Sequence, residues 1–197
     1  FFIAYNRRFY ESIKITKKII EKDGGLVSVI FEFNEMTKKI EKSKHSKQIK
    51  SKWVIANSSH LIDLVFFVTG SPKKISSFTL GKKSWHPTSS IFFGHGQSKN
   101  GVIITYSSNW DSPGRWGIEF MTKNYKIILK PLEYVKILKH KGQIIQLKSK
   151  DKKEFEFKPG FYSMIDKFEK DNFDDFCRID EQIDNLKIYN KIAGYNL

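Results

Sequence analysis

The middle of the chain, residues 75–158, constrains the fold most. Short apolar segments follow one another there, and turn signals separate several of them. Segments of four to eight residues with alternating or continuous apolar character, bounded by Gly, Pro, Asn and Ser, are typical of β-strands. Turn signals lie at residues 98–101, 111–114, 141–142 and 149–153. The pattern predicts strands at residues 75–80, 91–94, 102–109, 116–122, 126–129, 134–139, 143–147 and 155–157.

An earlier segment, residues 27–33, predicts one more strand and shows which kind of sheet it joins. Val27, Val29, Phe31 and Phe33 lie on one side of the predicted strand and the polar residues Ser28, Glu32 and Asn34 on the other, as in a strand with one buried face. A polar second face is typical of an open antiparallel sheet, whereas parallel strands covered on both sides are apolar throughout. We therefore expect a mainly antiparallel sheet.

Helical periodicity appears at both ends of the chain. Phe9, Ile13, Thr16 and Ile20 share one helical face. A second helix is expected over residues 59–69, with Asn57 and Ser58 as possible caps and with Gly70 and Pro72 as its end. Two further helices close the chain, with apolar stripes formed by Phe161, Ile165 and Phe168 and by Ile179, Ile183, Leu186 and Ala193.

Taken together, these elements predict the fold class. Helices flank a long run of strands, which indicates an α+β fold with one large, mainly antiparallel open sheet and with helices packed on one face. The lysine-rich residues 38–52 are predicted to be a mobile loop between them. A chain of 197 residues is long enough for one substantial core. We expect a single domain over residues 1–197.

The formal net charge of +14 raises the possibility of a nucleic-acid partner. Only four of the 35 basic residues are arginines, namely Arg7, Arg8, Arg115 and Arg178. Proteins that read bases and phosphates rely on the bidentate geometry of arginine. We therefore expect no nucleic-acid partner and interpret the lysines as a solvated basic surface, with which a small anionic substrate is compatible.

Cysteine content and hydropathy bear on localisation. Cys177 is the only cysteine, so no internal disulfide is possible, which favours the cytoplasm. No segment approaches the roughly 18 consecutive apolar residues of a membrane span, so no membrane partner is expected. The start of the chain has neither an initiator Met nor a signal peptide, and we expect it to be a piece of a longer protein.

Several catalytic motifs are absent from the sequence. It contains no G-x-G-x-x-G between a strand and a helix, no alternating βαβ unit, no P-loop, no H-E-x-x-H and no G-x-S-x-G. His45, His95 and His140 show no metal-ligand spacing, and no metal site is proposed. The chain by itself is not expected to bind a dinucleotide through the usual glycine-rich loop.

Four segments in order resemble the C-terminal half of the Gfo/Idh/MocA oxidoreductases. They are Tyr5-Asn6-Arg7-Arg8-Phe9, the segment from Asn57 to Leu64 with its H-x-x-D motif, the stretch from Trp116 to Glu133, and the closing helices at residues 161–171 and 179–192. The resemblance covers nearly the whole chain and is closest to members of surface-polysaccharide sugar pathways. It implies a dihydrodipicolinate-reductase-like C-terminal domain, with the Rossmann domain absent.

The resemblance also implies a function. The parent protein would be an NAD(P)-dependent dehydrogenase or reductase that acts on a hydroxyl of a sugar or nucleotide-sugar, and this chain would supply the substrate-binding half. NAD or NADP would be bound mainly by the missing N-terminal domain, so this fragment alone is expected to be inactive. The sheet would mediate homo-oligomerisation. The alternative is a non-catalytic dimerisation or interaction domain of the same fold.

His60 is the candidate catalytic residue. It stands in the first turn of the helix predicted over residues 59–69, where the helix dipole disfavours an imidazolium. A neutral ring there can accept a proton from a substrate hydroxyl. The alternative is a buried histidine packed against Leu64 and Phe67. Asp63, three residues on, could either orient the ring or serve the helix end.

This sequence departs from the family pattern at two points. A lysine that shares the proton chemistry with the histidine belongs to the missing domain, so none of the lysines here is assigned that role. Many members carry an aspartate four residues before the histidine, where this chain has Ala56. Asn57, one residue out of register, is the nearest polar side chain and is taken as a supporting residue.

Three further residues are candidates for substrate binding. Asn6 and Arg7 lie where the family often places residues near nicotinamide and substrate. If residues 1–5 form a strand, the two side chains point to opposite faces, so only one of them is expected to reach the site. Arg115 follows a Pro-Gly turn and could pair with a carboxylate or diphosphate, or could be a solvated turn residue.

Overall fold

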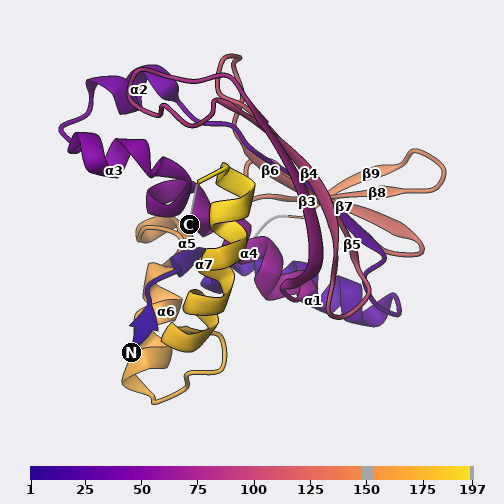
Figure 1. The fold of residues 1–197 in the computed structure, drawn as a ribbon. Helices are drawn as coiled ribbons and strands as arrows, with labels where there is room; N and C mark the ends of the chain where they lie inside the picture. Colours follow the sequence, from indigo (N-terminus) through magenta and orange to yellow (C-terminus); the bar gives the residue numbers. More distant parts are fainter. Residues whose placement is uncertain (148–152, 196–197) are drawn as a thin grey trace.

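The computed structural model describes residues 1–147 and 153–195 and has an α+β fold, in which helices lie on one face of an eight-stranded sheet (Figure 1). In spatial order the strands are β3 (Pro72–Leu80), β4 (Ile91–Ser98), β5 (Ile103–Asn109), β2 (Ser28–Phe33), β6 (Trp116–Met121), β7 (Tyr125–Leu129), β8 (Val135–Lys139) and β9 (Ile144–Leu147). A separate pair joins β1 (Phe2–Ile3) to β10 (Cys177–Arg178). The predicted fold class and the mainly antiparallel sheet are confirmed.

The first strand of the large sheet in the sequence, β2, lies at its centre. It pairs parallel with β5 and antiparallel with β6. Phe31 stands between Tyr106 of β5 and Ile118 of β6, and all three side chains are buried. The alternation predicted for this strand is confirmed at Val29, Phe31 and Phe33, each no more than 1 % exposed. A strand so placed must be apolar on its covered face because it has neighbours on both sides.

Helices cover one face of the sheet. The longer ones are α1 (Glu11–Lys22), α4 (Ser59–Thr69), α6 (Phe161–Glu169) and α7 (Ile179–Ala193), and the short ones are η1 (Asn6–Phe9, 3₁₀), α2 (Thr37–Lys42), α3 (Lys47–Ser51), η2 (Val54–Ser58, π-helical) and α5 (Lys153–Glu156). Helix α4 packs on the central strand β2, α7 on β3 and β4, and α1 on β8. None of the helices in the described part is long and apolar enough to cross a bilayer.

Two predictions about local structure are wrong. Residues 38–52, predicted as a mobile loop, contain α2 and α3, which project beside the sheet (Figure 1). The strand predicted at residues 155–157 is replaced by α5, because three residues are too few to separate a period of 2 from one of 3.6. The turn predicted at residues 149–153 lies outside the described residues except for Lys153.

The closing helices form as predicted, but only part of their apolar stripes faces the core. Phe168 on α6 is 54 % exposed and Ile183 on α7 is 56 % exposed, whereas Ala193 of the α7 stripe is buried. The other buried residues of α7 are Asn185, Tyr189 and Ile192. Periodicity therefore located these helices, and tertiary packing selected another face of α7.

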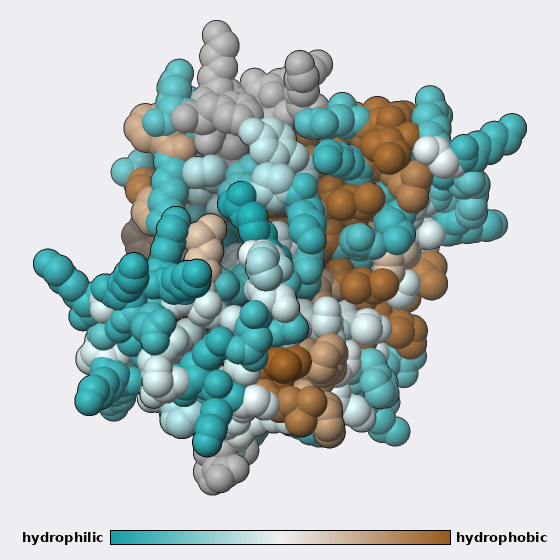
Figure 2. Space-filling model, turned by 90° about the horizontal axis from the view of Figure 1, so that it is seen from above, coloured by the Kyte–Doolittle hydropathy of each residue, from teal (hydrophilic) through white to brown (hydrophobic). Residues whose placement is uncertain are grey.

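The outer face of the sheet carries exposed apolar side chains. Phe78 on β3, Phe93 on β4, Ile30 on β2 and Ile103 on β5 are between 44 % and 60 % exposed. Apolar side chains gather in Figure 2 on the side where Figure 1 places the sheet. A patch of several large apolar residues on one face is typical of an interaction surface.

A buried ion pair connects three elements of the helical layer. Arg8 of η1 donates from Nε to Oδ2 of Asp63 at 2.8 Å and from Nη2 to Oδ1 at 2.5 Å, and it also reaches Glu181 of α7 at 2.5 Å. The side chains of Arg8 and Asp63 are 3 % and 0 % exposed. Burial alone would lower the pKa of Arg8. The hydrogen bonds that Arg8 donates to Asp63 and Glu181 outweigh the effect of burial and raise that pKa.

We predict that Asp63→Ala destabilises the fold by about 3–5 kcal/mol, because it leaves a buried guanidinium without its bidentate partner. The measurement is the free energy of unfolding in urea. Asp166→Ala removes an exposed i,i+4 pair with Lys170 and should leave the unfolding curve unchanged. An Asp63→Ala variant as stable as the wild type would show that Arg8 does not depend on this carboxylate.

Candidate functional site

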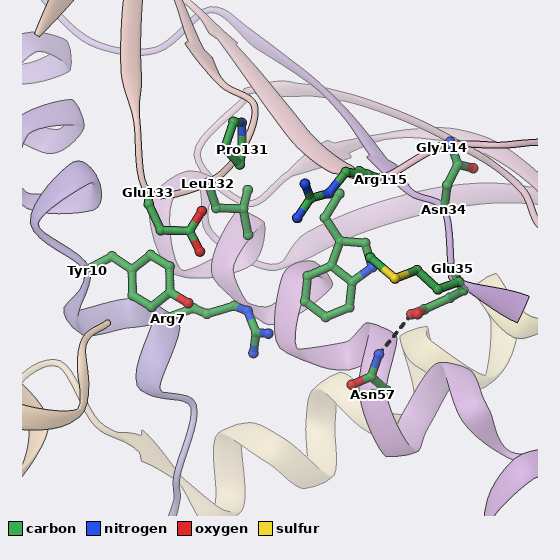
Figure 3. Close-up of a pocket in the computed structure, with 12 residues that line it drawn as sticks. Arg7, Tyr10, Asn34, Glu35, Asn57, Gly114, Arg115, Pro131, Leu132 and Glu133 are labelled. Atoms are coloured by element: carbon green, nitrogen blue, oxygen red, sulfur yellow. Dashed lines mark hydrogen bonds between the residues drawn. The ribbon is translucent and has the colours of Figure 1, made fainter. Parts of the chain in front are cut away.

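A cavity of about 290 Å³ opens where the end of β2 meets the start of β6 (Figure 3). Its walls come from η1, the segment after β2, the π-helical segment, the start of β6 and the turn after β7. It is lined by Arg7, Tyr10, Asn34, Glu35, Met36, Asn57, Gly114, Arg115, Trp116, Pro131, Leu132 and Glu133. Strand ends and a distorted helix are common places for binding residues because the scaffold behind them is rigid.

Strand pairing brings the two longest stretches of the cavity wall together. Phe33 at the end of β2 is opposite Trp116 at the start of β6. Residues 34–36 and 114–115 therefore leave the same edge of the sheet side by side. A Cβ on Gly114 would lie 2.2 Å from Nδ2 of Asn34, so this close approach requires glycine.

Arg7 and Trp116 form one wall of the cavity. The guanidinium carbon of Arg7 lies 4.5 Å from the centre of the Trp116 ring, at the distance of a cation–π contact. Burial lowers the pKa of Arg7, although Tyr10, Glu133 and Glu35 oppose that shift. The Arg7 charge is thus held partly away from water beside an aromatic ring.

The carboxylate of Glu35 is held by two residues of the π-helical segment. Asn57 donates from Nδ2 to Oε1 of Glu35 at 3.0 Å, and the hydroxyl of Ser58 donates to the same oxygen at 2.7 Å (Figure 3). Burial raises the pKa of Glu35, and these hydrogen bonds only partly offset it. Asn57 and Ser58, predicted as helix caps, are partners of this carboxylate instead.

The helix that carries His60 differs from its prediction. Residues 54–58 are π-helical and run directly into α4, and Ser58 itself has α-helical dihedral angles. His60 is therefore not in the first turn of an isolated helix, and the helix-dipole argument for its neutral ring is wrong. The π-helical segment is fixed by the Tyr195 hydroxyl, which accepts the backbone N–H of Val54 at 3.3 Å and lies 2.6 Å from Nε2 of His86.

His60 is nevertheless kept neutral, by other means. Burial lowers its pKa to about 4, and the nearby charges of Arg7 and Lys158 add to the shift. Its Nδ1 is buried without a hydrogen-bond partner among the described residues, and the Tyr5 ring lies edge-on at 5.0 Å. The neutral ring can accept a proton, but His60 is not among the residues that line the cavity.

The structure brings together only some of the predicted site residues. Arg7, Asn57 and Arg115 line the cavity. Asn6 does not, because its amide donates to the backbone carbonyl of Pro159 at 2.9 Å, and Asp63 is engaged by Arg8. Residues 6–9 form η1 rather than the continuation of a strand, but Asn6 and Arg7 do point to different surroundings.

Nine of the twelve lining residues were not predicted as site residues, and four of these nine are charged or aromatic: Glu35, Glu133, Tyr10 and Trp116. The available signal was their position, since Glu35 follows a predicted strand and Trp116 begins one. Charged and aromatic residues at strand ends are candidates for a site, but nothing in the sequence shows that these two ends are neighbours.

A second cluster, Asp63, Cys177 and Glu181, has ligand atoms within 4.8 Å of one another. Arg8 already binds both carboxylates, and burial raises the pKa of the Cys177 thiol to about 12. A thiolate and free carboxylates are what a metal ion would need. These residues therefore form an ion-pair network rather than a metal centre.

Comparison with known proteins gives a fold. No family model and no curated protein matches the sequence. A dehydrogenase (MviM) from Clostridium difficile superimposes with a TM-score of 0.73 at 17 % identity over 98 % of this chain and 61 % of its own. An oxidoreductase from Thermotoga maritima gives a TM-score of 0.69 at 12 % identity over 98 % of this chain and 60 % of its own.

A third similar structure is levoglucosan dehydrogenase in complex with NADH and levoglucosan. Its TM-score is 0.59 at 14 % identity, over 74 % of this chain and 46 % of that one. The chain thus has the fold of one part of these dehydrogenases and spans about half to three fifths of their length.

The described residues do not provide a cradle for a nicotinamide dinucleotide. Such a cradle needs a glycine-rich turn between a parallel strand and a helix. The parallel pair in the described part, β2 and β5, is not followed by that arrangement, since β2 leads to α2 through Asn34–Met36 and β5 leads to β6.

We predict that His60 remains neutral until the pH falls to about 4, as followed by NMR titration of its ring. Arg7→Met should raise this pKa, because it removes a neighbouring positive charge. The unfolded state takes up the proton first as the pH drops below about 6.5, so His60 should make the fold less stable between that pH and 4. His60→Gln should weaken this loss, and an unchanged urea–pH profile would contradict the burial of the ring.

Proposed function

We propose that this chain is the substrate-binding part of an NAD(P)-dependent oxidoreductase of the Gfo/Idh/MocA type, acting on a hydroxyl of a sugar or nucleotide-sugar. The observation that carries the proposal is the superposition of 98 % of the chain on part of a dehydrogenase. One of the similar structures holds NADH and a sugar derivative. The dinucleotide would be bound mainly by a second domain.

The lining of the cavity suits a polyhydroxylated ligand. Trp116 offers an aromatic surface to the C–H groups of a sugar ring, and Glu35 and Glu133 offer acceptors to its hydroxyls. Arg7, Arg115 and Asn57 offer donors. Sites for small polar molecules combine such an apolar wall with a few convergent polar groups.

His60 is our candidate for the group that handles the proton of the reacting hydroxyl. Its pKa of about 4 leaves the ring neutral near pH 7, and the charge of Arg7, which lines the cavity, contributes to that low pKa. Asn57 would support the site through Glu35, since it holds that carboxylate at 3.0 Å. Asp63 would act at a distance, by fixing η1 to α4 through Arg8.

We also propose that the outer face of the sheet joins two copies of the protein. Phe78 and Phe93 are directly opposite each other on β3 and β4 and are both exposed. A self-complementary patch on both subunits is what a two-fold dimer requires. The same surface would serve the alternative of a non-catalytic dimerisation domain, which the activity test below separates from an enzyme.

The test is NAD(P)H formation or consumption by the full-length protein with a panel of sugars and nucleotide-sugars. We expect His60→Ala to lower the turnover rate about 10²–10⁴-fold, the usual contribution of a general base. The control is His140→Ala, since His140 is exposed and its Nε2 lies 3.1 Å from the carbonyl oxygen of Lys123. Equal activity of wild type and His60→Ala would remove His60 from the mechanism, and no activity with bound cofactor would favour the non-catalytic alternative.

A further inference from the structure

Arg7 lines the cavity with its charge unpaired. Among residues 1–147 and 153–195, no carboxylate lies within 4.0 Å of its guanidinium and no acceptor takes a hydrogen bond from its N–H groups. The guanidinium lies over the face of Trp116, at 4.5 Å. None of its nitrogens is buried without a partner, so its donors are open to a ligand in the cavity.

Arg115 offers a second unpaired guanidinium to the same cavity. It comes from the start of β6, and its side chain points toward Leu132 and Glu133 across the cavity from Arg7 (Figure 3). In the described part of the chain it forms no ion pair either. The other two arginines do: Arg8 binds Asp63 and Glu181, and Arg178 lies 3.8 Å from Asp180. The two arginines without a carboxylate partner are thus the two that line this cavity.

The lining of the cavity also contains two carboxylates that could pair with these arginines but do not. Glu133 and Glu35 both line it, yet neither comes within 4.0 Å of Arg7 or Arg115. Oε1 of Glu35 is taken by Asn57 and Ser58, and burial raises the pKa of this acid. Asn57 and Ser58 therefore hold one of the two acids, Glu35, in hydrogen bonds that do not involve either guanidinium.

We propose that this cavity binds an anionic group of the substrate, a carboxylate or a phosphate, between Arg7 and Arg115. The proposal rests on the function proposed above and narrows its substrate class to acidic or phosphorylated sugars. Arginine binds two oxygens of such a group through two parallel N–H donors. A neutral hydroxyl accepts a weaker hydrogen bond from each guanidinium than an ionised oxygen does.

The charge of the whole chain favours the same class of ligand. The formal net charge is +14, and the segment of residues 38–52, which follows Met36 of the cavity, contains seven lysines and a single acid, Glu41. A positive field around a cavity raises the encounter rate of anions and falls with added salt. Salt dependence therefore forms part of the test.

The experiment is isothermal calorimetry of the full chain with three probes: glucose, glucuronate and glucose 6-phosphate. We expect at least one of the two anions to bind about tenfold more tightly than glucose, with the preferred anion distinguishing a carboxylate from a phosphate site. Higher salt should weaken the binding of that anion and leave glucose unaffected.

Variants assign the effect to the two arginines. Arg115→Gln and Arg7→Gln should each weaken the preferred anion about tenfold to a hundredfold, since each removes charge-assisted hydrogen bonds. Arg178→Gln makes the same change of charge outside the cavity and should leave binding unaffected. Arg7→Lys keeps the charge but loses the paired donors, so it should restore only part of the affinity. Circular dichroism of each variant confirms that it is folded.

Three results would overturn the proposal: no binding of either anion, equal affinities for glucose and both anions, or variants of Arg7 and Arg115 that bind like Arg178→Gln. Its failure is distinguishable from that of the proposed function. If neutral sugars are oxidised by the full-length protein with equal kcat/KM in wild type and Arg115→Gln, the oxidoreductase stands and the anion site falls. If anions bind as expected but no nicotinamide is reduced or oxidised, the anion site stands and the oxidoreductase falls.

Discussion

The ion pair between Arg8, Asp63 and Glu181 is the interaction on which the helical layer depends. It fixes η1 to α4 and α7. Two residues proposed above for the site lie close to it in the sequence, since Arg7 precedes Arg8 and His60 lies three residues before Asp63. Buried ion pairs contribute little net free energy compared with apolar packing, but breaking one leaves a charge stranded. Its role here is therefore positional: it sets where Arg7 and His60 lie against the sheet.

The central place of β2 determines the rest of the site. Because β2 is inserted between β5 and β6, the residues that follow it leave the sheet beside the residues that precede β6. Glu35 and Trp116 are far apart in the sequence and become neighbours in the lining of one cavity. A sheet in which β2 paired only with its sequence neighbours would have separated them.

Local patterns in the sequence predicted most of the fold. Alternation located most of the strands, and Gly70 located the C-terminal end of α4, because these features act over a few residues. The π-helical segment escaped prediction because Tyr195, from the end of the chain, fixes it. The site was predicted in part: Arg7, Asn57 and Arg115 line the cavity, whereas Glu35 and Glu133 depend on strand order, which periodicity does not report. The exposed stripe of α7 shows the same limit, since Ile183 follows helical spacing yet faces outward.

The π-helical turn at residues 54–58 has a consequence for how this site can change over evolution. A π-turn accommodates one residue more than an α-helical turn in the same length of axis. The extra residue makes the helical position of Asn57 independent of that of Asp63, so the residues of the cavity wall can shift by one position while the ion pair of Asp63 stays in place. Insertion or loss of a single codon in this turn would therefore change whether residue 57 or residue 56 faces Glu35. Helix α4 would not have to be rebuilt.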